Sequence, residues 1–477
     1  MEVKYQKYEG VYPEVAGLHG NFSICLSGGG MRAATCACGW IKGLEILGLK
    51  PKYISSVSGG SWYNIPYSYR IDKNLDFNGT YYNPKDCSLK NITSYLTDAK
   101  SFEYILSKAN ISASYVYYRN WSISVTQTFI DPYKLYDVGS YPTLDVYPII
   151  CSSLIGSGST EIKDIETKEN ETIENETIET ESSFNKFSPV EFTPNYHYVL
   201  NGKYTIDPIS FTSNSAIIDG KIPKPTKIIS LGEQAAFSSQ VIEAALGDIE
   251  VNNPSNFVSG TWNVVNGLYG YLGRASQRLS DTFYPRLDPL QNQVFNSKYS
   301  DGACTDNTGI LALVRRKETK IICLYSASTD ISSSNFTDIN MCGDFSALFG
   351  RCTGSDINIF QNTPVAEYNR QRQIFNSNLY DKIVANLTTN SSYTLRTTTI
   401  ENPNIFTTAY DISVLFILCS SPKKWLDLIP EETKKKLPNE FPNISVTKSK
   451  YSPELVGALK QFSTYQITSN EVLIRNL

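Results

Sequence analysis

The sequence is poor in histidine and methionine, and it lacks the patterns that mark several classes of protein. Only two of its 477 residues are histidines, and three are methionines. No apolar run reaches the roughly 18 to 20 residues that a membrane-spanning helix needs. The ten cysteines form no Cys-x-x-Cys pair and no cluster with histidine, which argues against zinc sites and against a disulfide framework. We therefore expect no bound metal ion.

Charge and the amino-terminal residues limit the partners and the compartment. The formal net charge of -4 is too close to zero for a typical nucleic-acid-binding protein. The first 25 residues contain no apolar stretch of the kind that a secretory signal has. Because the cysteines show no disulfide pattern either, we expect a cytoplasmic protein that binds no nucleic acid.

One segment differs from the rest in composition. Residues 161–181 carry nine acidic side chains against two lysines, a balance of -7, and repeat the sequence ENETI. A segment with so much charge and so few apolar residues cannot offset the entropy of ordering. The sequence therefore predicts a disordered acidic insertion at about 158–184, within a single domain that spans 1–477. The hydrophobic content of 41% is sufficient for a large core elsewhere.

The most informative part of the chain is 21–61, which reads as strand, glycine loop, helix, strand and tight turn. The apolar run at 21–26 ends at a glycine loop, and apolar residues then recur at spacings of three and four as far as Leu47. A second strand at 53–57 ends at Ser58. Such a crossover joins two parallel strands, so both loops should lie at one edge of the sheet. This pattern predicts an α/β fold with its ligand site at that edge.

Ser58 has the surroundings of a nucleophile. Small residues flank it, with Ser56 two positions before and Gly59 and Gly60 after, as the strand-to-helix turn of a nucleophile elbow requires. The usual pattern is Gly-x-Ser-x-Gly, and Ser56 takes the place of the first glycine. An ordinary Ser/Gly loop after a strand is the alternative that this segment alone leaves open.

The loop SGGGMRA at 27–33 is suited to an anion. Backbone N–H groups of Gly28, Gly29 and Gly30 at a helix N-terminus can hold the oxyanion of acyl transfer. A phosphate is the poorer alternative, because neither the P-loop spacing nor Gly-x-Gly-x-x-Gly is present. Arg32 adds a cation in the first turn of the helix, either for the same anion or for a surface ion pair.

The base that a serine nucleophile needs is predicted to be a carboxylate. Neither His19 nor His197 has a motif around it, which favours a dyad in which an aspartate accepts the serine proton directly. The candidate is Asp301, which follows a strand-like stretch and precedes Gly302. Asp306 is the rival, and an ordinary Asp-Gly turn is the alternative without a function.

Four ordered segments resemble one family. SGGGMRA at 27–33, SVSGGSW at 56–62, FSPVEF at 187–192 and Asp-Gly at 301–302 are similar to the catalytic domain of cytosolic (group IV) phospholipase A2 and of fungal-type phospholipase B (lysophospholipase), which are related to the patatin-like hydrolases. The resemblance implies an α/β hydrolase, with a central, mostly parallel sheet flanked by helices, in one phospholipase-type catalytic domain. The residues that it implicates are Ser58 as nucleophile, Asp301 as its partner, Gly28, Gly29 and Gly30 as the oxyanion loop, and Arg32 as the phosphate-binding residue.

The resemblance also implies a function. The chain would be a lipid acyl-ester hydrolase that cleaves glycerophospholipids or lysophospholipids through an acyl-serine intermediate, in peripheral contact with a membrane surface. The calcium-binding domain of some relatives has no counterpart here, so we expect neither calcium nor another cofactor. Ser56 and Ala303 stand where the family usually has glycine. These departures leave open a catalytically inactive lipid-binding relative.

One carboxyl-terminal segment is ambiguous. Residues 422–436 mix Trp425, Leu428 and Ile429 with lysines. The pattern fits an interfacial patch or, more simply, core packing beside solvated lysines.

Overall fold

The structure, a computed structural model, describes most of the chain. The described residues are 18, 20–110, 121–135, 146–155, 187–194, 197–199, 230–239, 284–288, 293–339, 342–354, 364–405, 407–446, 448 and 450–477. His19, the side chain of His197 and the predicted acidic insertion at 158–184 lie outside them.

One sheet forms the centre of the fold. In the described residues its strands run in the order β5-β4-β3-β2-β1-β8-β10-β9, with β7 paired to β3 and β6 paired to β7. The central strands from β3 to β10 are parallel, and the outer strands are antiparallel. The bounds are β1 Ser23–Leu26, β2 Tyr53–Val57, β3 Tyr147–Ile155, β4 Phe187–Phe192, β5 His197–Val199, β6 Tyr284–Asp288, β7 Gln293–Asp301, β8 Lys320–Tyr325, β9 Ser392–Thr398 and β10 Asp411–Leu418.

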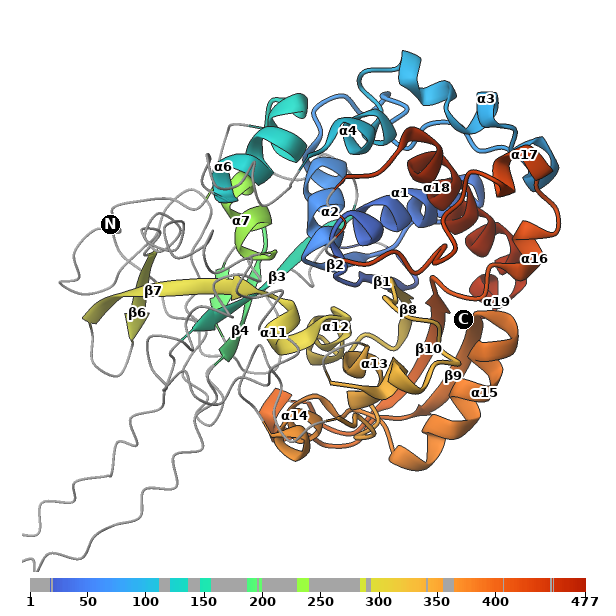
Figure 1. Cartoon of the computed structure of the whole chain (residues 1–477). Coiled ribbons are helices and arrows are strands. Elements are labelled where there is room, and N and C mark those ends of the chain that lie inside the picture. Colours follow the sequence, from blue (N-terminus) through green and yellow to red (C-terminus); the bar gives the residue numbers. More distant parts are fainter. Residues whose placement is uncertain are drawn as a thin grey trace, which may run out of the picture.

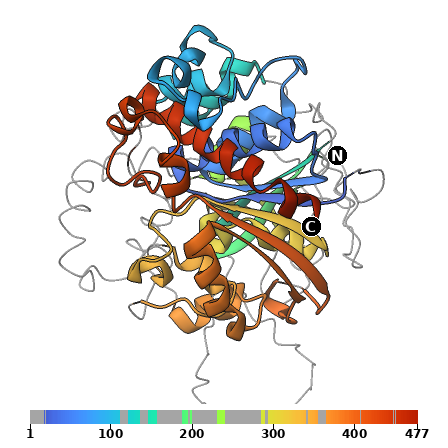
Figure 2. The same cartoon turned by 90° about the vertical axis from the view of Figure 1, so that its right-hand side faces the viewer.

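Helices cover both faces of this sheet, which gives three layers (Figures 1 and 2). Helices α1, α2, α4 and α18 lie on one face, and α12, α13 and α15 lie on the other. The α-helix bounds are α1 Gly30–Ile46, α2 Gly59–Tyr69, α3 Leu89–Ile92, α4 Phe102–Lys108, α6 Trp121–Val125, α7 Leu231–Phe237, α11 Ala303–Asp306, α12 Ile310–Arg315, α13 Gly343–Ala347, α14 Val365–Arg372, α15 Tyr380–Asn390, α16 Lys423–Leu426, α17 Glu431–Lys434, α18 Pro453–Ser469 and α19 Glu471–Arg475. Short 3-10 turns at Pro84–Asp86, Ser94–Thr97, Asp131–Tyr133, Ser334–Thr337, Ser377–Leu379 and Pro403–Ile405, and a π-helical turn at Thr126–Ile130, complete the helical structure that is described.

Successive side chains along the buried strands point to opposite faces of the sheet, and they form two separate hydrophobic cores. In β1, Ile24 and Leu26 join the core on the side of α1 and α18, whereas Cys25 joins the core on the side of α12. In β8, Ile322 and Cys323 are divided between the cores in the same way. Strands that are covered on both faces favour apolar residues at most positions, which explains the short apolar runs in the sequence. The predicted α/β fold, with a central sheet flanked by helices, is confirmed.

The strand order reverses beside β1. The chain passes from β1 to β2 and β3 on one side, and later to β8 and β10 on the other. Open α/β sheets bind ligands outside the strand carboxyl ends at such a switch point. The glycine loop after β1 lies here: the Ser27 N–H donates to the Leu324 carbonyl of β8 at 3.1 Å, and the Ser27 hydroxyl accepts the Ser326 N–H at 2.7 Å.

The segment 422–436 belongs to the core. Trp425 and Ile429 are buried, whereas Leu428 is 50% exposed. The Trp425 ring stacks on Phe441, and it also contacts Phe462 of α18. Core packing beside solvated lysines therefore explains the pattern, and Trp425 is not an interfacial residue.

Within the described ranges, no helix is both long and apolar enough to cross a bilayer. The same residues contain no group of three or more His, Cys, Asp and Glu side chains that could hold a metal ion. All ten cysteines are buried thiols.

Candidate active site

Ser58 and Asp301 meet at the carboxyl edge of the sheet. The Ser58 hydroxyl donates a hydrogen bond of 2.9 Å to Oδ2 of Asp301. Ser58 follows β2, Asp301 ends β7, and both strands pair with β3. Val57 lies opposite Cys151 of β3, and Asp301 lies opposite the next residue of β3, Ser152. Strand β3 therefore brings together two residues that are 243 positions apart in the chain.

Ser58 has the backbone conformation of a tight elbow. Its φ of 50° and ψ of -122° lie in a region that residues other than glycine rarely adopt. A Cβ atom at Gly59 would overlap the carbonyl oxygen of Gly30, and one at Gly60 would lie 2.8 Å from the Leu26 oxygen. Small residues are required after Ser58 because the start of α2 packs directly against the glycine loop.

A polar recess accommodates Ser56, which stands where a glycine is usual. The Ser56 hydroxyl accepts a hydrogen bond from Nδ2 of Asn64 at 3.0 Å and pairs with the Ser61 hydroxyl at 3.0 Å. Asn64 also donates to the Ile54 carbonyl. The extra hydroxymethyl group therefore has partners, and the Ser58 elbow forms beside it.

The glycine loop offers two N–H groups to an anion. The Gly28 N–H, predicted as an oxyanion donor, instead donates to the Asn307 carbonyl at 3.0 Å and so fixes the loop. Gly29 (φ 135°) and Gly30 (φ 57°) turn the chain into α1. In the part of the chain that the structure describes, their N–H groups have no acceptor. A Cβ atom at Gly28 would lie 3.1 Å from Cβ of Ser58, so the loop runs beside the predicted nucleophile.

Two helices begin at this position. Helix α1 begins at Gly30, and α2 begins at Gly59, directly after Ser58. Aligned peptide dipoles give each N-terminus a partial positive charge. An oxyanion beside Oγ of Ser58 would be stabilised by both helix ends as well as by the loop N–H groups.

Burial brings the titration of the Asp301 carboxyl close to neutral pH. Its side chain is only 1% exposed, and Oδ1 accepts the Ala303 N–H at 2.8 Å. Burial raises the pKa of Asp301 to about 7, although the hydrogen bonds from Ala303 and Ser58 favour the ionised form. A general base works best when its pKa lies close to the working pH.

The rival carboxylate, Asp306, holds the start of α12. Its Oδ1 accepts the N–H and the hydroxyl of Thr308 at 2.9 and 2.6 Å, and its Oδ2 accepts the Leu311 N–H at 2.8 Å. The bond to Leu311 satisfies a donor that the N-terminus of α12 leaves without an intrahelical partner, and the bonds to Thr308 fix the turn before the helix. The geometry therefore favours Asp301 over Asp306 as the partner of Ser58.

Arg32 is buried beside the glycine loop, with 1% of its surface exposed. Its Nε and Nη2 donate to the hydroxyl and the carbonyl of Ser326, both at 2.9 Å, and its Nη1 donates to the Ile444 carbonyl. The guanidinium thus connects α1 to the chain after β8 and to the loop before α18. These bonds use three of the five guanidinium N–H groups, so phosphate binding, the role that the resemblance implies, would fall to the other two.

Arg32→Lys separates the two roles. Lysine cannot reproduce the planar set of donors, so we expect a lower melting temperature whichever role is correct. If Arg32 also binds phosphate, kcat/KM on a phospholipid should fall about tenfold more than on a neutral monomeric ester, because a charge-assisted hydrogen bond contributes about 1.5 to 3 kcal/mol. Equal losses on the two substrates would show that Arg32 only holds the loop in place.

Ser238, which no sequence motif marks, connects the two halves of the dyad. Its carbonyl accepts the N–H groups of both Ser58 and Gly302, at 2.9 and 3.2 Å. Its hydroxyl also accepts the Ser58 N–H at 2.9 Å and donates to the Cys151 carbonyl at 2.6 Å. One residue at the end of α7 therefore positions the serine elbow, the aspartate turn and β3 relative to one another.

Ser238→Ala is expected to lower kcat about tenfold with little change in KM, because a small misplacement of reacting groups slows the chemical step more than binding. Ser239→Ala is the matched control. Ser239 also lies after α7 and is buried, but its hydroxyl bonds to Ala235, Ala236 and Trp62 and not to the dyad. Steady-state kinetics and melting temperatures of both variants test this prediction. Equal kcat losses would mean that Ser238 acts only through stability.

A buried ion-pair cluster supports the aspartate side of the site. Glu191 of the FSPVEF segment pairs with Nη2 of Arg315 at 2.6 Å and with Nη1 of Arg316 at 2.7 Å. Burial opposes ionisation of Glu191, but the charges of the two arginines outweigh it and lower the pKa of this carboxyl. The cluster connects β4 to the end of α12, which follows the Asp301 turn. The resemblance marked this segment but assigned Glu191 no role.

Comparisons with known proteins find similarity among solved structures. No family model matches the sequence, and no curated protein matches it. A structure of human GIVD cytosolic phospholipase A2 is 12% identical to this chain with a TM-score of 0.45, over 96% of this chain and 62% of that one. Two structures of that human protein with methyl γ-linolenyl fluorophosphonate, one of which also contains terbium chloride, are 11% and 13% identical with TM-scores of 0.40 and 0.39. Each covers 96% of this chain and 59% of its own, so this chain spans about three fifths of those proteins.

Proposed function

We propose that this protein hydrolyses lipid acyl esters, with Ser58 as the nucleophile and Asp301 as the general base. The observation that carries the proposal is the 2.9 Å hydrogen bond between Oγ of Ser58 and Oδ2 of Asp301. The buried aspartate, the strained elbow and the two helix N-termini are the features that acyl transfer needs. A lipid-binding relative without activity would have no need of an aspartate buried against this serine. The lipid class rests on the resemblance of the four sequence segments.

The reaction would proceed in two steps. Oγ of Ser58 attacks the ester carbonyl carbon while Asp301 accepts the hydroxyl proton, and the Gly29 and Gly30 N–H groups hold the oxyanion. Collapse of the tetrahedral intermediate expels the alcohol, which takes the proton back from Asp301. Water, deprotonated by Asp301, then attacks the carbonyl of the acyl-serine. Collapse of this second intermediate releases the fatty acid, and Oγ of Ser58 takes the proton back from Asp301. One such oxyanion donor typically contributes about 100- to 1000-fold to the rate.

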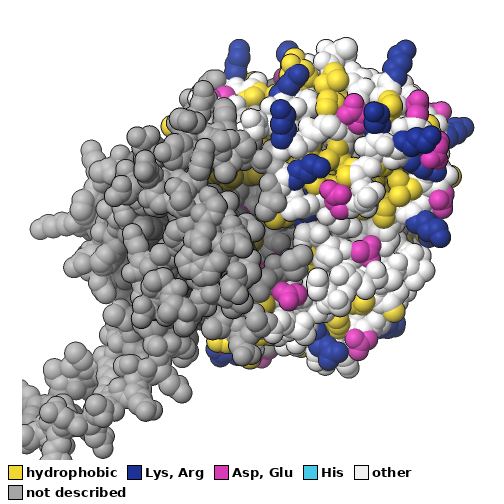
Figure 3. All heavy atoms as spheres, viewed as in Figure 1, with side chains coloured by type: hydrophobic (Ala, Val, Ile, Leu, Met, Phe, Trp, Pro, Cys, Tyr) yellow, Lys and Arg dark blue, Asp and Glu magenta, His cyan; other side chains and the backbone are white. Residues whose placement is uncertain are grey.

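Glycerophospholipids or lysophospholipids are the proposed substrates, and a membrane surface is the proposed peripheral partner. On the face shown in Figure 3, hydrophobic side chains lie among Lys and Arg side chains. Val446 is 53% exposed, and its carbonyl oxygen would lie 3.4 Å from a Cβ atom at Gly30. An exposed apolar residue beside the glycine loop suits contact with lipid at the entrance to the site. We propose a cytoplasmic location and a single catalytic domain that requires no calcium.

Covalent labelling tests the proposal. A fluorophosphonate probe should modify Ser58, as peptide mass spectrometry would show, because only an activated serine reacts. Product analysis on a phosphatidylcholine with two different acyl chains should then detect a released fatty acid and show which position is cleaved. Absence of both labelling and fatty acid release, or labelling at another serine, would contradict the assignment.

A further inference from the structure

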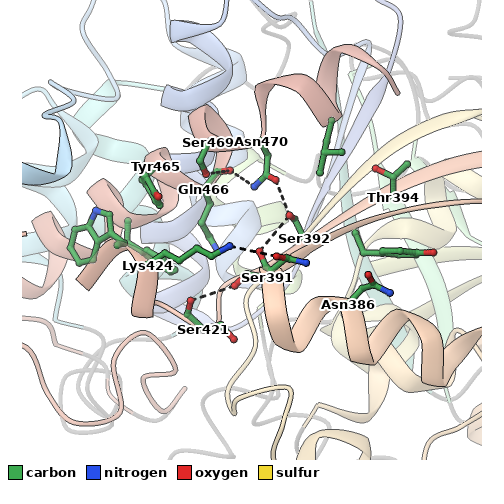
Figure 4. A pocket seen from close by; sticks show the side chains of 15 residues that line it. Asn386, Ser391, Ser392, Thr394, Ser421, Lys424, Tyr465, Gln466, Ser469 and Asn470 are labelled. Carbon is green, nitrogen blue, oxygen red and sulfur yellow. Dashed lines mark hydrogen bonds between the residues drawn. The ribbon is translucent and has the colours of Figure 1, made fainter. Parts of the chain in front are cut away.

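A polar pocket of about 620 Å³ lies between α15, the start of β9, α16 and the end of α18, away from the dyad (Figure 4). Its polar side chains largely bond to one another or to the backbone. The Ser392 hydroxyl donates to Oδ1 of Asn470 at 2.8 Å, and Nζ of Lys424 donates to Oδ1 of Asn390 at 3.5 Å. Such mutual bonds leave few groups for a ligand. The proposed active site differs, because one amide oxygen there has no partner in the described part of the chain.

This amide belongs to Asn307, which lies beside the proposed nucleophile. Asn307 ends α11, the short helix that follows Asp301, and its main-chain carbonyl accepts the Gly28 N–H at 3.0 Å. A Cβ atom at Gly28 would lie 2.1 Å from Oδ1 of Asn307 and 3.1 Å from Cβ of Ser58. The amide oxygen and the Ser58 side chain therefore lie close together on the same side of the glycine loop.

Asp344, at the start of α13, sets the orientation of this amide. The Asn307 side chain donates a hydrogen bond to the Asp344 carboxyl, so its nitrogen faces Asp344 and its oxygen faces the glycine loop. The Tyr368 hydroxyl of α14 also donates to Asp344, and the Arg372 guanidinium lies 3.6 Å from the centre of the Tyr368 ring. Asp344 is thus held from a second helix, and the amide oxygen of Asn307 is an acceptor with a fixed direction.

The amide oxygen is accessible. Asn307 is only partly buried, as are Gly29 and Gly30 of the loop. Among the described residues, Oδ1 of Asn307 accepts no hydrogen bond, and it is not one of the buried atoms that lack a partner. It is therefore open to solvent. A polar group that is fixed in direction and left free at a reaction centre can orient a substrate by binding a donor on it.

Asn307 lies on the side of Ser58 where the alcohol leaves. In the proposed mechanism the leaving alcohol takes its proton from Asp301, and Asn307 belongs to the turn that follows Asp301. Burial raises the pKa of Asp301, and Asp344 is close enough for its charge to add to this effect. Two carboxylates nearby repel an anionic group, so the substrate group that meets Oδ1 is a neutral hydroxyl. Because Oδ1 lies so close to Ser58, that hydroxyl must be near the ester bond.

We propose that Asn307 determines specificity by contacting the substrate: its amide oxygen accepts a hydrogen bond from a free hydroxyl on the carbon next to the ester, and Asp344 holds the amide in position. This role rests on the proposed function, since it presupposes attack by Ser58 on the ester. A glycerolipid that keeps a hydroxyl beside its single acyl group is then cleaved faster than the same lipid without that hydroxyl.

Values of kcat/KM for the full chain on 1-palmitoyl-lysophosphatidylcholine and on its 2-deoxy analogue test the proposal. The unsubstituted protein should prefer the substrate with the hydroxyl about threefold to tenfold, as one hydrogen bond predicts. Asn307→Ala should reduce this preference to about one. Any shift of the glycine loop in that variant lowers both rates and leaves their ratio unchanged. Asp344→Ala should reduce the preference as well, because the amide then has no fixed direction.

Thr305→Val is the matched control. Thr305 is a partly buried residue of the same turn, but its hydroxyl bonds to Ser153 and Gly302 and not to the glycine loop. The preference for the substrate with the hydroxyl should therefore be the same in this variant as in the unsubstituted protein.

The same measurements separate this role from the proposed function. Equal kcat/KM on the two substrates in the unsubstituted protein would overturn the role of Asn307 and leave the hydrolase intact, and this comparison needs no variant to fold. A preference that persists in Asn307→Ala, or hydrolysis of phosphatidylcholine without hydrolysis of the lysophospholipid, would also overturn it. Release of no fatty acid from any of the three lipids would instead contradict the proposed function, and the role of Asn307 with it.

Discussion

Replacement of Ser58 with alanine should abolish ester hydrolysis and fluorophosphonate labelling while the protein stays folded. In the proposed mechanism the Ser58 hydroxyl, which donates to Oδ2 of Asp301, is the nucleophile. Without it no acyl-enzyme can form, so we expect turnover to fall by about 10,000-fold or more. Alanine retains the Cβ atom, so the elbow and its contacts with the glycine loop should persist. Initial rates with a soluble ester, labelling and circular dichroism are the measurements.

Ser68→Ala is the control for this prediction. Ser68 is a buried serine of the same helix that follows Ser58, and its hydroxyl donates to Oδ1 of Asn64. Its replacement should leave labelling intact and turnover close to that of the unsubstituted protein. If Ser58→Ala retained substantial turnover, a different nucleophile would have to be sought.

Asp301→Asn should lower turnover about 100- to 10,000-fold, because an amide of the same shape cannot accept the proton from Ser58. In the unsubstituted protein, kcat/KM should rise with pH and level off above an apparent pKa near 7. The reason is that burial raises the pKa of Asp301 to about 7 and only the ionised carboxylate is a base. A pH–rate profile on a soluble ester measures this. The expected pKa of about 7 lies in the middle of the range from about pH 5 to about pH 9. A rate that stays constant over that range would contradict the role of Asp301 as the base.

Asp301→Asn should lower turnover but raise the stability of the folded protein at alkaline pH. In the unfolded chain an aspartate has its ordinary pKa near 4. Between that value and about 7, the folded protein holds a proton on Asp301 that the unfolded protein has lost, so stability falls as pH rises through this range. Asparagine carries no charge, so Asp301→Asn should melt at a higher temperature than the unsubstituted protein in alkaline buffer. The difference should shrink as the buffer is made acidic.

Asp306→Asn is the control for Asp301. Asp306 accepts three hydrogen bonds at the start of α12 and does not contact Ser58. Its replacement should cost about 1 kcal/mol of stability, as loss of a helix cap does, and leave most of the turnover intact. If turnover depended on Asp306 more than on Asp301, the two carboxylates would have to exchange roles.

Local sequence determined the first half of the site. The strand at Ser23–Leu26, the helix at Gly30–Ile46 and the strand at Tyr53–Val57 closely follow the predicted ranges, because apolar periodicity and glycine act over neighbouring residues. The crossover that joins them places the glycine loop and Ser58 at one edge by handedness alone. The turn after Asp301 marks this residue as a candidate, but the turn does not predict how far Asp301 lies from Ser58.

Tertiary structure decided the rest, because each remaining feature joins segments far apart in the chain. Pairing of β7 with β3 places Asp301 against Ser58. The carbonyl and the hydroxyl of Ser238 accept the Ser58 N–H, although Ser238 lies 180 positions further along the chain in a stretch with no motif. The Gly28 N–H is occupied by Asn307 and not free for an oxyanion. Such hydrogen bonds depend on where strand pairing and helix packing place the backbone. The pattern of side chains along the sequence does not reveal them.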